Sequence, residues 1–342
     1  MSTLLSDLGA DLPLIAAPMA GGPSTPALVT AAARAGGLGF LAGGYKTAQA
    51  LAGQIHTTRA QDVAFGVNLF APNPVPISHE AYRRYARAVQ VEADRYGLTL
   101  PEAPIEDDDH WTDKIDLLTS APVPWVSFTF GIPDRAVLRA LRTAGSTVLQ
   151  TVTSAEEARL AAESGVDALI VQAAAAGGHS ATLTPARPPQ PIQLTDLITA
   201  VRHAVALPII ATGGITTAAD VAATLAAGAE AAMIGTVLLR THESGASAPH
   251  KTALVDPAFA TTTITRAFTG RPARALRNHF IDQYDPIAPE GYPALHHLTG
   301  PLRKAATAAG DTLLINLWAG TGHRHAKAER AVDTYARLAG RL

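Results

Sequence analysis

Short apolar runs alternate with Ala-rich stretches of helical periodicity along the first ~240 residues of the chain. Most runs stop at glycine or at a polar residue, as buried strands do before a following helix. An open, doubly wound sheet is the alternative to a barrel, but residues 19–23 do not form its Gly-rich dinucleotide fingerprint. The pattern therefore predicts a (β/α)₈ TIM barrel, a mixed α/β fold. The runs expected to be its strands are 14–17, 39–42, 65–70, 125–130, 147–152, 168–172, 208–212 and 231–234.

Local signals place several helix ends. Thr25 is expected to cap a helix that begins at Pro26. Ser154 and Glu157 have the spacing of a capping box. Either Thr216 or Thr217 is placed to cap the helix that follows residues 208–212.

Two segments depart from the alternating pattern. Residues 71–120 form an insertion after the third strand, with a charged helical stretch at 81–96 and an acidic run at 106–109. The acidic run is expected to be solvated, and the insertion, too polar for a core, to lie over the barrel mouth as a lid or to form a subunit contact. We expect a barrel over residues 1–254 and a C-terminal helical extension, 255–342, that packs near the mouth. The pocket side chains are then expected to come from the insertion and the extension.

Composition narrows the classes of protein to consider. Hydrophobic residues make up 47% of the 342 residues and charged residues 16%, which is typical of a chain with much buried surface. The formal net charge of −2 favours neither nucleic acid nor anionic membrane as a partner. The chain has no cysteine, which excludes disulfides, thiolate metal sites and a cysteine nucleophile. With neither a signal peptide nor a membrane span apparent, we expect a cytoplasmic protein.

The segment 208–242 predicts a phosphate site. Gly213-Gly214 and Gly235-Thr236 each follow a short apolar run and precede helical sequence. Backbone N–H groups at the ends of two neighbouring parallel strands would then point toward the same ligand. In a TIM barrel the loops after the seventh and eighth strands commonly bind phosphate.

Other residues at expected strand ends are candidates for chemistry. Asn68 and Gln172 carry amides that suit a flavin pyrimidine edge, although each would equally satisfy backbone groups. His179 follows Gly177-Gly178, which permit a turn that aims the imidazole over the mouth. An imidazole there suits a general base or an anion-binding group, although most histidines are ordinary. The histidines at 296–297 and 323–325 lack a carboxylate at ligand spacing, so no metal site is expected.

The sequence resembles the nitronate monooxygenase family, formerly called 2-nitropropane dioxygenase, in its class I bacterial branch. The stretches that carry the resemblance are APMAGGPSTPALVTAAARAGGLGF (17–40), FGVNLF (65–70), AAAAGGHSA (173–181), ATGGI (211–215), MIGT (233–236), TRAFTGRPAR (265–274) and YPALHHLTGPLR (292–303).

The resemblance implies a TIM barrel that binds FMN without a covalent bond and oxidises alkyl nitronates, such as propionate 3-nitronate, with O₂ to a carbonyl compound and nitrite. It assigns the catalytic role to His179. Partners would be a small anionic substrate and O₂, with an oligomer as a further expectation. The cofactor-binding residues it implies are Met19, Asn68, Gln172, Gly177, Gly214, Met233, Gly235 and Thr236.

Two positions depart from the family pattern. Ala175 stands where the family typically has Glu, so a partner that would orient the local site is missing. Met233 stands where the family often has Gln. The alternatives are an FMN-dependent NAD(P)H-using reductase of the enoyl-thioester type, a specialised flavoenzyme with an altered reaction, a flavin-free lyase or isomerase, and a non-enzymatic flavin-binding protein.

Overall fold

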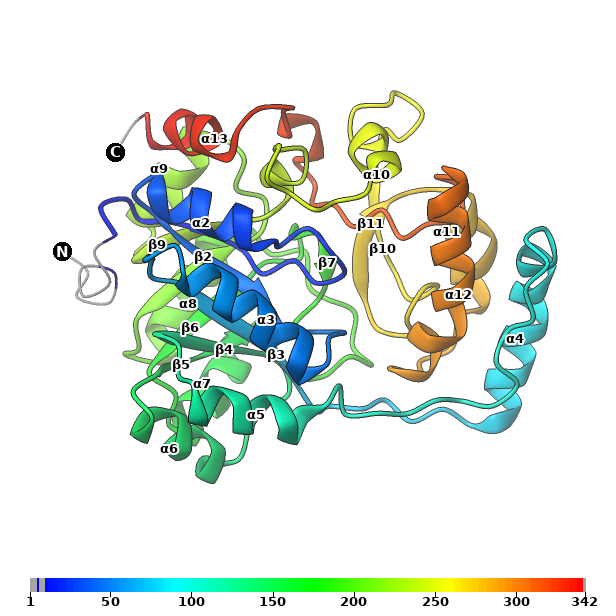
Figure 1. The fold of residues 1–342 in the computed structure, drawn as a ribbon, viewed down its shortest axis with the longest axis horizontal. Helices are drawn as coiled ribbons and strands as arrows, with labels where there is room; N and C mark the ends of the chain where they lie inside the picture. Colours follow the sequence, from blue (N-terminus) through cyan, green and yellow to red (C-terminus); the bar gives the residue numbers. More distant parts are fainter. Residues whose placement is uncertain (1–4, 6–9, 341–342) are drawn as a thin grey trace.

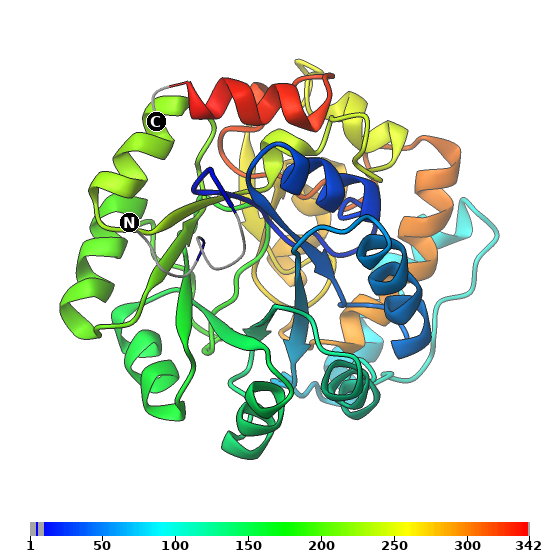
Figure 2. The ribbon, with the colours of Figure 1, turned by 60° about the vertical axis from the view of Figure 1, so that its left-hand side comes forward.

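The computed structural model describes residue 5 and residues 10–340. Eight parallel strands close a barrel in the order β1-β2-β3-β4-β5-β6-β8-β9 (Figures 1 and 2). The ladder between β1 and β9, which pairs Ile15 with Met233, closes it. The predicted TIM barrel is confirmed. Its strands are β1 (Leu14–Ala16), β2 (Leu38–Ala42), β3 (Gly66–Ala71), β4 (Trp125–Phe130), β5 (Thr147–Val152), β6 (Ala168–Gln172), β8 (Ile209–Thr212) and β9 (Ala231–Ile234).

Helices surround this barrel, and the last of them comes from the end of the chain (Figure 2). α13 packs against α2 and α9, so it fills the eighth helical place. Residues between β9 and α13 thus form a second, larger excursion from the barrel, while the division at residue 254 stays a prediction. The barrel helices are α2 (Pro26–Arg34), α3 (Ala48–Arg59), α5 (Trp111–Ser120), α6 (Arg135–Thr143), α7 (Ala155–Ser164), α8 (Leu194–Ala204), α9 (Ala218–Ala226) and α13 (Ala331–Ala339).

The helix caps largely follow the sequence. Thr25 caps α2 with Pro26 at its start, and Thr217, with Asp220, forms a complete capping box on α9. The box predicted at α7 is only half formed. Ser154 caps the helix, but the Glu157 carboxylate bonds to Thr153, Thr182 and Leu183 instead of to the Ser154 amide. This carboxylate ties the loop after β6 to the barrel.

The excursion after β9 contains strands as well as helices. β10 and β11 pair with the two-residue strand β7 in an antiparallel sheet, in the order β10-β11-β7. This sheet and its helices lie to one side of the barrel in Figure 1. Its elements are α10 (Ala248–Ala253), β10 (Thr262–Thr265), β11 (Ala273–Leu276), α11 (His279–Tyr284), α12 (Ala294–Ala309) and the short 3₁₀ helices η2 (Asp285–Ile287) and η3 (His323–His325), with η1 (Thr236–Leu238) just before them and β7 at Gly178–His179.

The helical middle of the insertion packs against this extension, while its ends meet the rim of the mouth. There Asn73 donates to the Phe130 and Leu183 carbonyls, and Asp109 accepts from the Tyr45 amide. The insertion's helix α4 (His79–Asp94) lies beside α12, far from the barrel strands (Figure 1). Tyr82, Tyr85 and Val89 form a buried stripe at helical spacing within the apolar core of the extension. The expectation that the insertion is too polar for a core is wrong, because a polar helix needs only one apolar face to contribute to a core.

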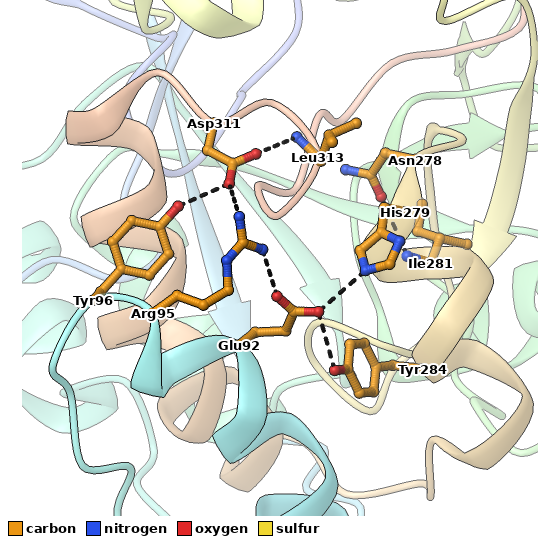
Figure 3. Close-up of polar contacts among 9 residues, drawn as sticks. All are labelled: Glu92, Arg95, Tyr96, Asn278, His279, Ile281, Tyr284, Asp311 and Leu313. Carbon is orange, nitrogen blue, oxygen red and sulfur yellow. Dashed lines mark hydrogen bonds and ion pairs between the residues drawn. The ribbon is translucent and has the colours of Figure 1, made fainter.

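Polar contacts fasten α4 to α11 at the same interface (Figure 3). Glu92, 7% exposed, accepts hydrogen bonds from Arg95 at 2.6 Å, His279 at 3.1 Å and the Tyr284 hydroxyl at 3.3 Å. Asp311 accepts from Tyr96 at 2.8 Å and from Arg95 at 3.4 Å. Burial alone would raise the pKa of Glu92, but the bonds from Arg95 and His279 outweigh burial and lower it.

Two of the four residues of the acidic run form ion pairs, although the run was expected to be solvated. Glu106 and Asp108 are exposed, but Asp109 pairs with Lys114 at 2.7 Å, and Lys114 is 1% exposed. Asp107 pairs with His297 on α12 at 2.8 Å. Within the described ranges, no helix is both long and apolar enough to cross a membrane.

Candidate active site

A cavity of about 370 Å³ opens at the carboxyl ends of the strands. It is lined by residues at the strand ends and in the loops after them, and by residues from 239–250 and 269–322, which follow β9. Of the residues that the structure describes, none between 71 and 120 lines it, so the expected contribution of the insertion is wrong. The predicted site residues all line this cavity: Met19, Asn68, Gln172, Gly177, His179, Gly214, Met233, Gly235 and Thr236.

Two sets of backbone contacts hold His179. As part of β7, it pairs in register with Ala273 of β11, so the extension provides the strand that fixes it. The Gln172 side chain donates to the His179 carbonyl at 3.2 Å and accepts from the Ala181 amide at 2.8 Å. Gly178, at φ +77°, provides the turn. Gln172 therefore spans the loop that presents the imidazole; its predicted contact with flavin stays a prediction.

The His179 side chain is partly buried, and its imidazole is neutral. Its Nε2 lies 2.9 Å from the Thr269 hydroxyl. Burial, together with the charges of Arg271 and Arg303, lowers the pKa of His179 to about 3. The imidazole is thus uncharged at pH 7 and carries a nitrogen lone pair that can accept a hydrogen bond. Aromatic rings surround it, with centroids 5.4 to 5.8 Å away: Phe130, Tyr292 and Trp318.

A buried arginine supplies positive charge behind the imidazole. Arg271 is 0% exposed, donates to the Thr182 carbonyl at 2.5 Å and lies 4.0 Å over the Phe130 ring. Burial lowers its pKa to about 10, which leaves it charged at pH 7. In the described part of the chain, no carboxylate pairs with it and its Nε–H has no partner. Such an uncompensated charge favours an anion nearby.

A stacked pair forms another wall of the cavity. The rings of Tyr45 and His296 lie 4.0 Å apart at 5°. The Tyr292 hydroxyl donates to that of Tyr45 at 3.4 Å, and burial raises the pKa of Tyr45 to about 12. Asp109 accepts from the Tyr45 amide at 2.9 Å, so the acidic run supports this wall from behind. Sequence reasoning missed the pair, although the His-His doublet had drawn attention to the segment.

The backbone beside Gly214, Gly235 and Thr236 fits a phosphate. In the described part of the chain, the backbone N–H groups of Gly214, Gly235 and Thr236 donate to no protein acceptor. Gly214 adopts φ +83°, which favours glycine. The Thr236 hydroxyl accepts from the Gly320 amide at 2.9 Å, so the extension closes this end. A glycine is required at position 177 because the backbone of Gly320 lies close to it: a Cβ there would be 2.5 Å from the Gly320 nitrogen.

Asn68 offers an acceptor to a ligand. Its Nδ2 donates to the hydroxyls of Ser127 at 2.9 Å and Thr129 at 3.0 Å. These bonds orient the amide and leave Oδ1 without a partner among the described residues. Met19 and Met233 provide apolar surface in the same cavity. Free amides, one oriented carbonyl and apolar surface together fit a flavin mononucleotide.

Position 175 does not orient the histidine. Ala175 is not among the residues that line the cavity, and its carbonyl accepts from the Thr321 amide at 3.1 Å. The partner of His179 is instead Thr269, from the extension. Among the residues described, no group of three or more His, Asp or Glu side chains is placed to hold a metal ion.

Comparison with known proteins gives the same family for almost the whole chain. The nitronate monooxygenase family profile matches residues 2–335. The chain belongs to the nitronate monooxygenase family. It is 33% identical over 329 residues to a probable nitronate monooxygenase of Staphylococcus aureus (strain Newman), covering 93% of this chain and 90% of that protein.

Two solved structures are similar to the chain over almost its whole length. The chain is similar to nitroalkane oxidase from Streptomyces ansochromogenes, at 47% identity and a TM-score of 0.93 over 99% of this chain and 98% of the other. It is also similar to FabK from Thermotoga maritima, at 25% identity and a TM-score of 0.75 over 99% and 95%. As a member of the nitronate monooxygenase family, the protein is an enzyme, a flavin-dependent oxidoreductase.

Proposed function

We propose that this enzyme binds FMN and uses O₂ to oxidise alkyl nitronates, propionate 3-nitronate among them, to carbonyl compounds and nitrite. The observation that carries the proposal is a neutral His179 in the same cavity as the unpaired amides of Gly214, Gly235 and Thr236. The amides suit a phosphate, and the buried Arg271 favours an anionic substrate near the imidazole.

The cofactor and the protein have separate tasks. Gly214, Gly235 and Thr236 would hold the FMN phosphate, and Asn68 would accept a hydrogen bond from the flavin ring. When bound, FMN accepts electrons from the substrate and passes them to O₂. His179, held neutral, takes the proton from the α-carbon of a neutral nitroalkane, a step that a nitronate does not require.

An absorption spectrum of the purified protein, followed by anaerobic addition of propyl-1-nitronate, tests the proposal. We expect a flavin spectrum that identifies FMN after release and that bleaches when the nitronate is added. NAD(P)H is the control: rapid bleaching by NAD(P)H, with none by the nitronate, would support the reductase alternative instead. A protein that takes up no FMN would exclude both.

The role of His179 is tested by comparing substrates. In His179→Asn, oxidation of neutral 1-nitropropane should fall roughly 100-fold or more, because no base remains to remove the proton. Oxidation of propyl-1-nitronate should change much less. Equal losses on the two substrates would mean that His179 does not act as the base.

A further inference from the structure

The cavity lining contains a single permanently charged side chain among the described residues. Among its lining residues in the described chain there is no Asp, Glu or Lys, and Arg303 is the one arginine. Arg303 comes from the middle of α12, in the extension. Within the described ranges it forms no ion pair with a carboxylate. Its charge is therefore compensated only by neutral acceptors.

Those neutral acceptors fix the guanidinium without using all of its hydrogens. Nε donates to the Thr299 hydroxyl at 3.0 Å, and Nη2 donates to the His296 carbonyl at 2.9 Å and approaches His296 Nδ1 at 3.2 Å. Nη1 donates once, to Asn316 Oδ1 at 3.3 Å. A guanidinium carries five N–H donors, so one Nη1–H is left over.

Asn316 adds donors at the same place. Its oxygen is turned toward Arg303, and its Nδ2 has no protein partner among the residues described. Both side chains line the cavity. An Nη1–H and an amide NH₂, on two hydrogen-bonded side chains that line one cavity, provide donors for the two oxygens of a carboxylate.

We propose that Arg303 and Asn316 form a subsite for a carboxylate on the tail of the substrate. The proposal rests on the proposed function, because it assigns one end of the nitronate substrate to this pair. Arg303 and the proposed phosphate amides have different neighbours: Gly214 and Thr236 adjoin residues 320–321, whereas Arg303 contacts His296, which stacks on Tyr45. Substrates with an anionic tail are thereby preferred over apolar ones of the same length.

A matched pair of substrates tests this preference. Propionate 3-nitronate and propyl-1-nitronate differ only by a carboxylate in place of a methyl group. We expect Arg303→Gln to lower the ratio of their kcat/KM values, carboxylated over apolar, by roughly tenfold or more. Lys304→Gln, an exposed neighbour on α12, is the control and should leave the ratio unchanged. An unchanged ratio in Arg303→Gln would overturn the proposal, and so would loss of bound FMN, since Arg303 would then serve the cofactor.

Asn316→Asp separates charge from packing. This nearly isosteric change keeps Arg303 but places a carboxylate beside its guanidinium. The two charges then cancel, and the amide donors of Asn316 are lost. We expect the same fall in the substrate ratio without loss of thermal stability. If Arg303 and Asn316 act only in packing α12, this variant should keep the wild-type ratio, and the proposal fails.

Calorimetric titration with propionate gives a readout that needs no turnover. Propionate should bind the wild type and Lys304→Gln, and bind Arg303→Gln and Asn316→Asp roughly tenfold or more weakly. If the wild type oxidises no nitronate yet shows this pattern, the proposed function fails while the anion site holds. Equal binding of propionate to all four proteins would overturn the subsite even in an active nitronate oxidase.

Discussion

His179 and Thr269 lie 90 residues apart in the sequence, and their side chains meet at 2.9 Å, from Nε2 to Oγ1. The same hydroxyl lies 3.3 Å from the Arg271 carbonyl, to which it can donate. When Oγ1 donates there, it accepts from Nε2–H, and the lone pair of His179 is then on Nδ1. Nδ1 has no protein partner among the described residues, and the residue lines the cavity. We therefore expect Thr269 to be a positioning residue that favours this tautomer of the imidazole.

Removal of this hydroxyl should affect the two kinds of substrate differently. In Thr269→Val, we expect kcat/KM for neutral 1-nitropropane to fall roughly tenfold to 100-fold, because the tautomer with a basic Nδ1 is no longer favoured. The value for propyl-1-nitronate should stay within about threefold, since that substrate needs no proton removal. Steady-state oxygen consumption measures both, and Thr269→Ser should restore the wild-type ratio. Equal losses on both substrates would indicate a purely structural role.

The burial of His179 should also appear in the pH dependence of stability. Its pKa is about 3 in the folded protein and about 6.5 when unfolded, so the unfolded state binds the proton first as pH falls. The stability from a neutral His179 is fully present above pH ~6.5 and is lost as pH falls toward ~3. Urea unfolding at several pH values between 6 and 4 measures how steeply the free energy of unfolding depends on pH. This dependence should be weaker in His179→Asn than in wild type, by about 1.4 kcal/mol per pH unit. The same change at the exposed His203 is the control, and a slope equal to that of wild type in His179→Asn would contradict the expectation.

Much of the barrel could be predicted because each buried strand is visible in the sequence as a short apolar run. β4, β5, β6 and β9 begin and end as expected, since each is an apolar run bounded by polar or turn residues. The position of His179 and of the glycines of the proposed phosphate site could also be predicted, because strand ends converge in this fold. A whole wall of the cavity could not be. Thr269, Tyr45 and Arg303 reach it through contacts between distant segments, which no local spacing records.

The apolar face of α4, and hence its packing against a core, could have been predicted from the sequence. Tyr82, Tyr85 and Val89 recur at spacings of three and four, the signal of an apolar helix face. The abundance of charge on the other faces concealed it. The half-formed capping box is a different case. Glu157 has the right spacing from Ser154, but its carboxylate instead binds residues of the loop after β6, a tertiary contact that outweighs the local one.

Substitution at Gly214 should separate cofactor binding from backbone strain. Gly214 has φ +83°, and a Cβ there would lie 3.2 Å from that of Ala175. Gly97 has φ +64° with open space around it, at the end of α4, so Gly97→Ala is a matched control. Each alanine should destabilise the protein by about 1–2 kcal/mol. Only Gly214→Ala should also weaken FMN binding, by roughly tenfold, measured as quenching of FMN fluorescence. Equal FMN affinity in both variants would argue against a phosphate at Gly214.

The Glu92 network at α4 should support stability and not catalysis (Figure 3). In Glu92→Gln, a buried carboxylate that accepts from Arg95, His279 and Tyr284 becomes an amide, so we expect a loss of about 1–3 kcal/mol in the free energy of unfolding. Because the folded pKa of Glu92 is lowered, its contribution is present above the unfolded pKa and is lost as pH falls through the folded value. The difference from wild type should therefore shrink in acid.

Two comparisons check this assignment. Glu80→Gln, an exposed site in the first turn of α4, should stay within about 0.5 kcal/mol of wild type. The kcat of Glu92→Gln at 25 °C should equal that of wild type, since α4 contributes no described residue to the cavity. A fall in kcat with stability unchanged would mean that α4 influences the reaction directly.

Asp109 and Lys114 offer a test of a buried ion pair that supports a cavity wall. Lys114 is 1% exposed and lies 2.7 Å from Asp109, which also accepts from the Tyr45 amide. In Asp109→Asn, the ammonium stays buried without its counter-charge, which should cost about 3 kcal/mol or more of stability. In the double variant with Lys114→Met, no charge is buried, so most of that loss should be recovered. Chemical unfolding of the four proteins of the cycle measures the coupling, with the exposed Asp108→Asn as a control. If Lys114→Met does not rescue Asp109→Asn, the carboxylate acts through Tyr45 alone, and the loss should then appear as an altered KM.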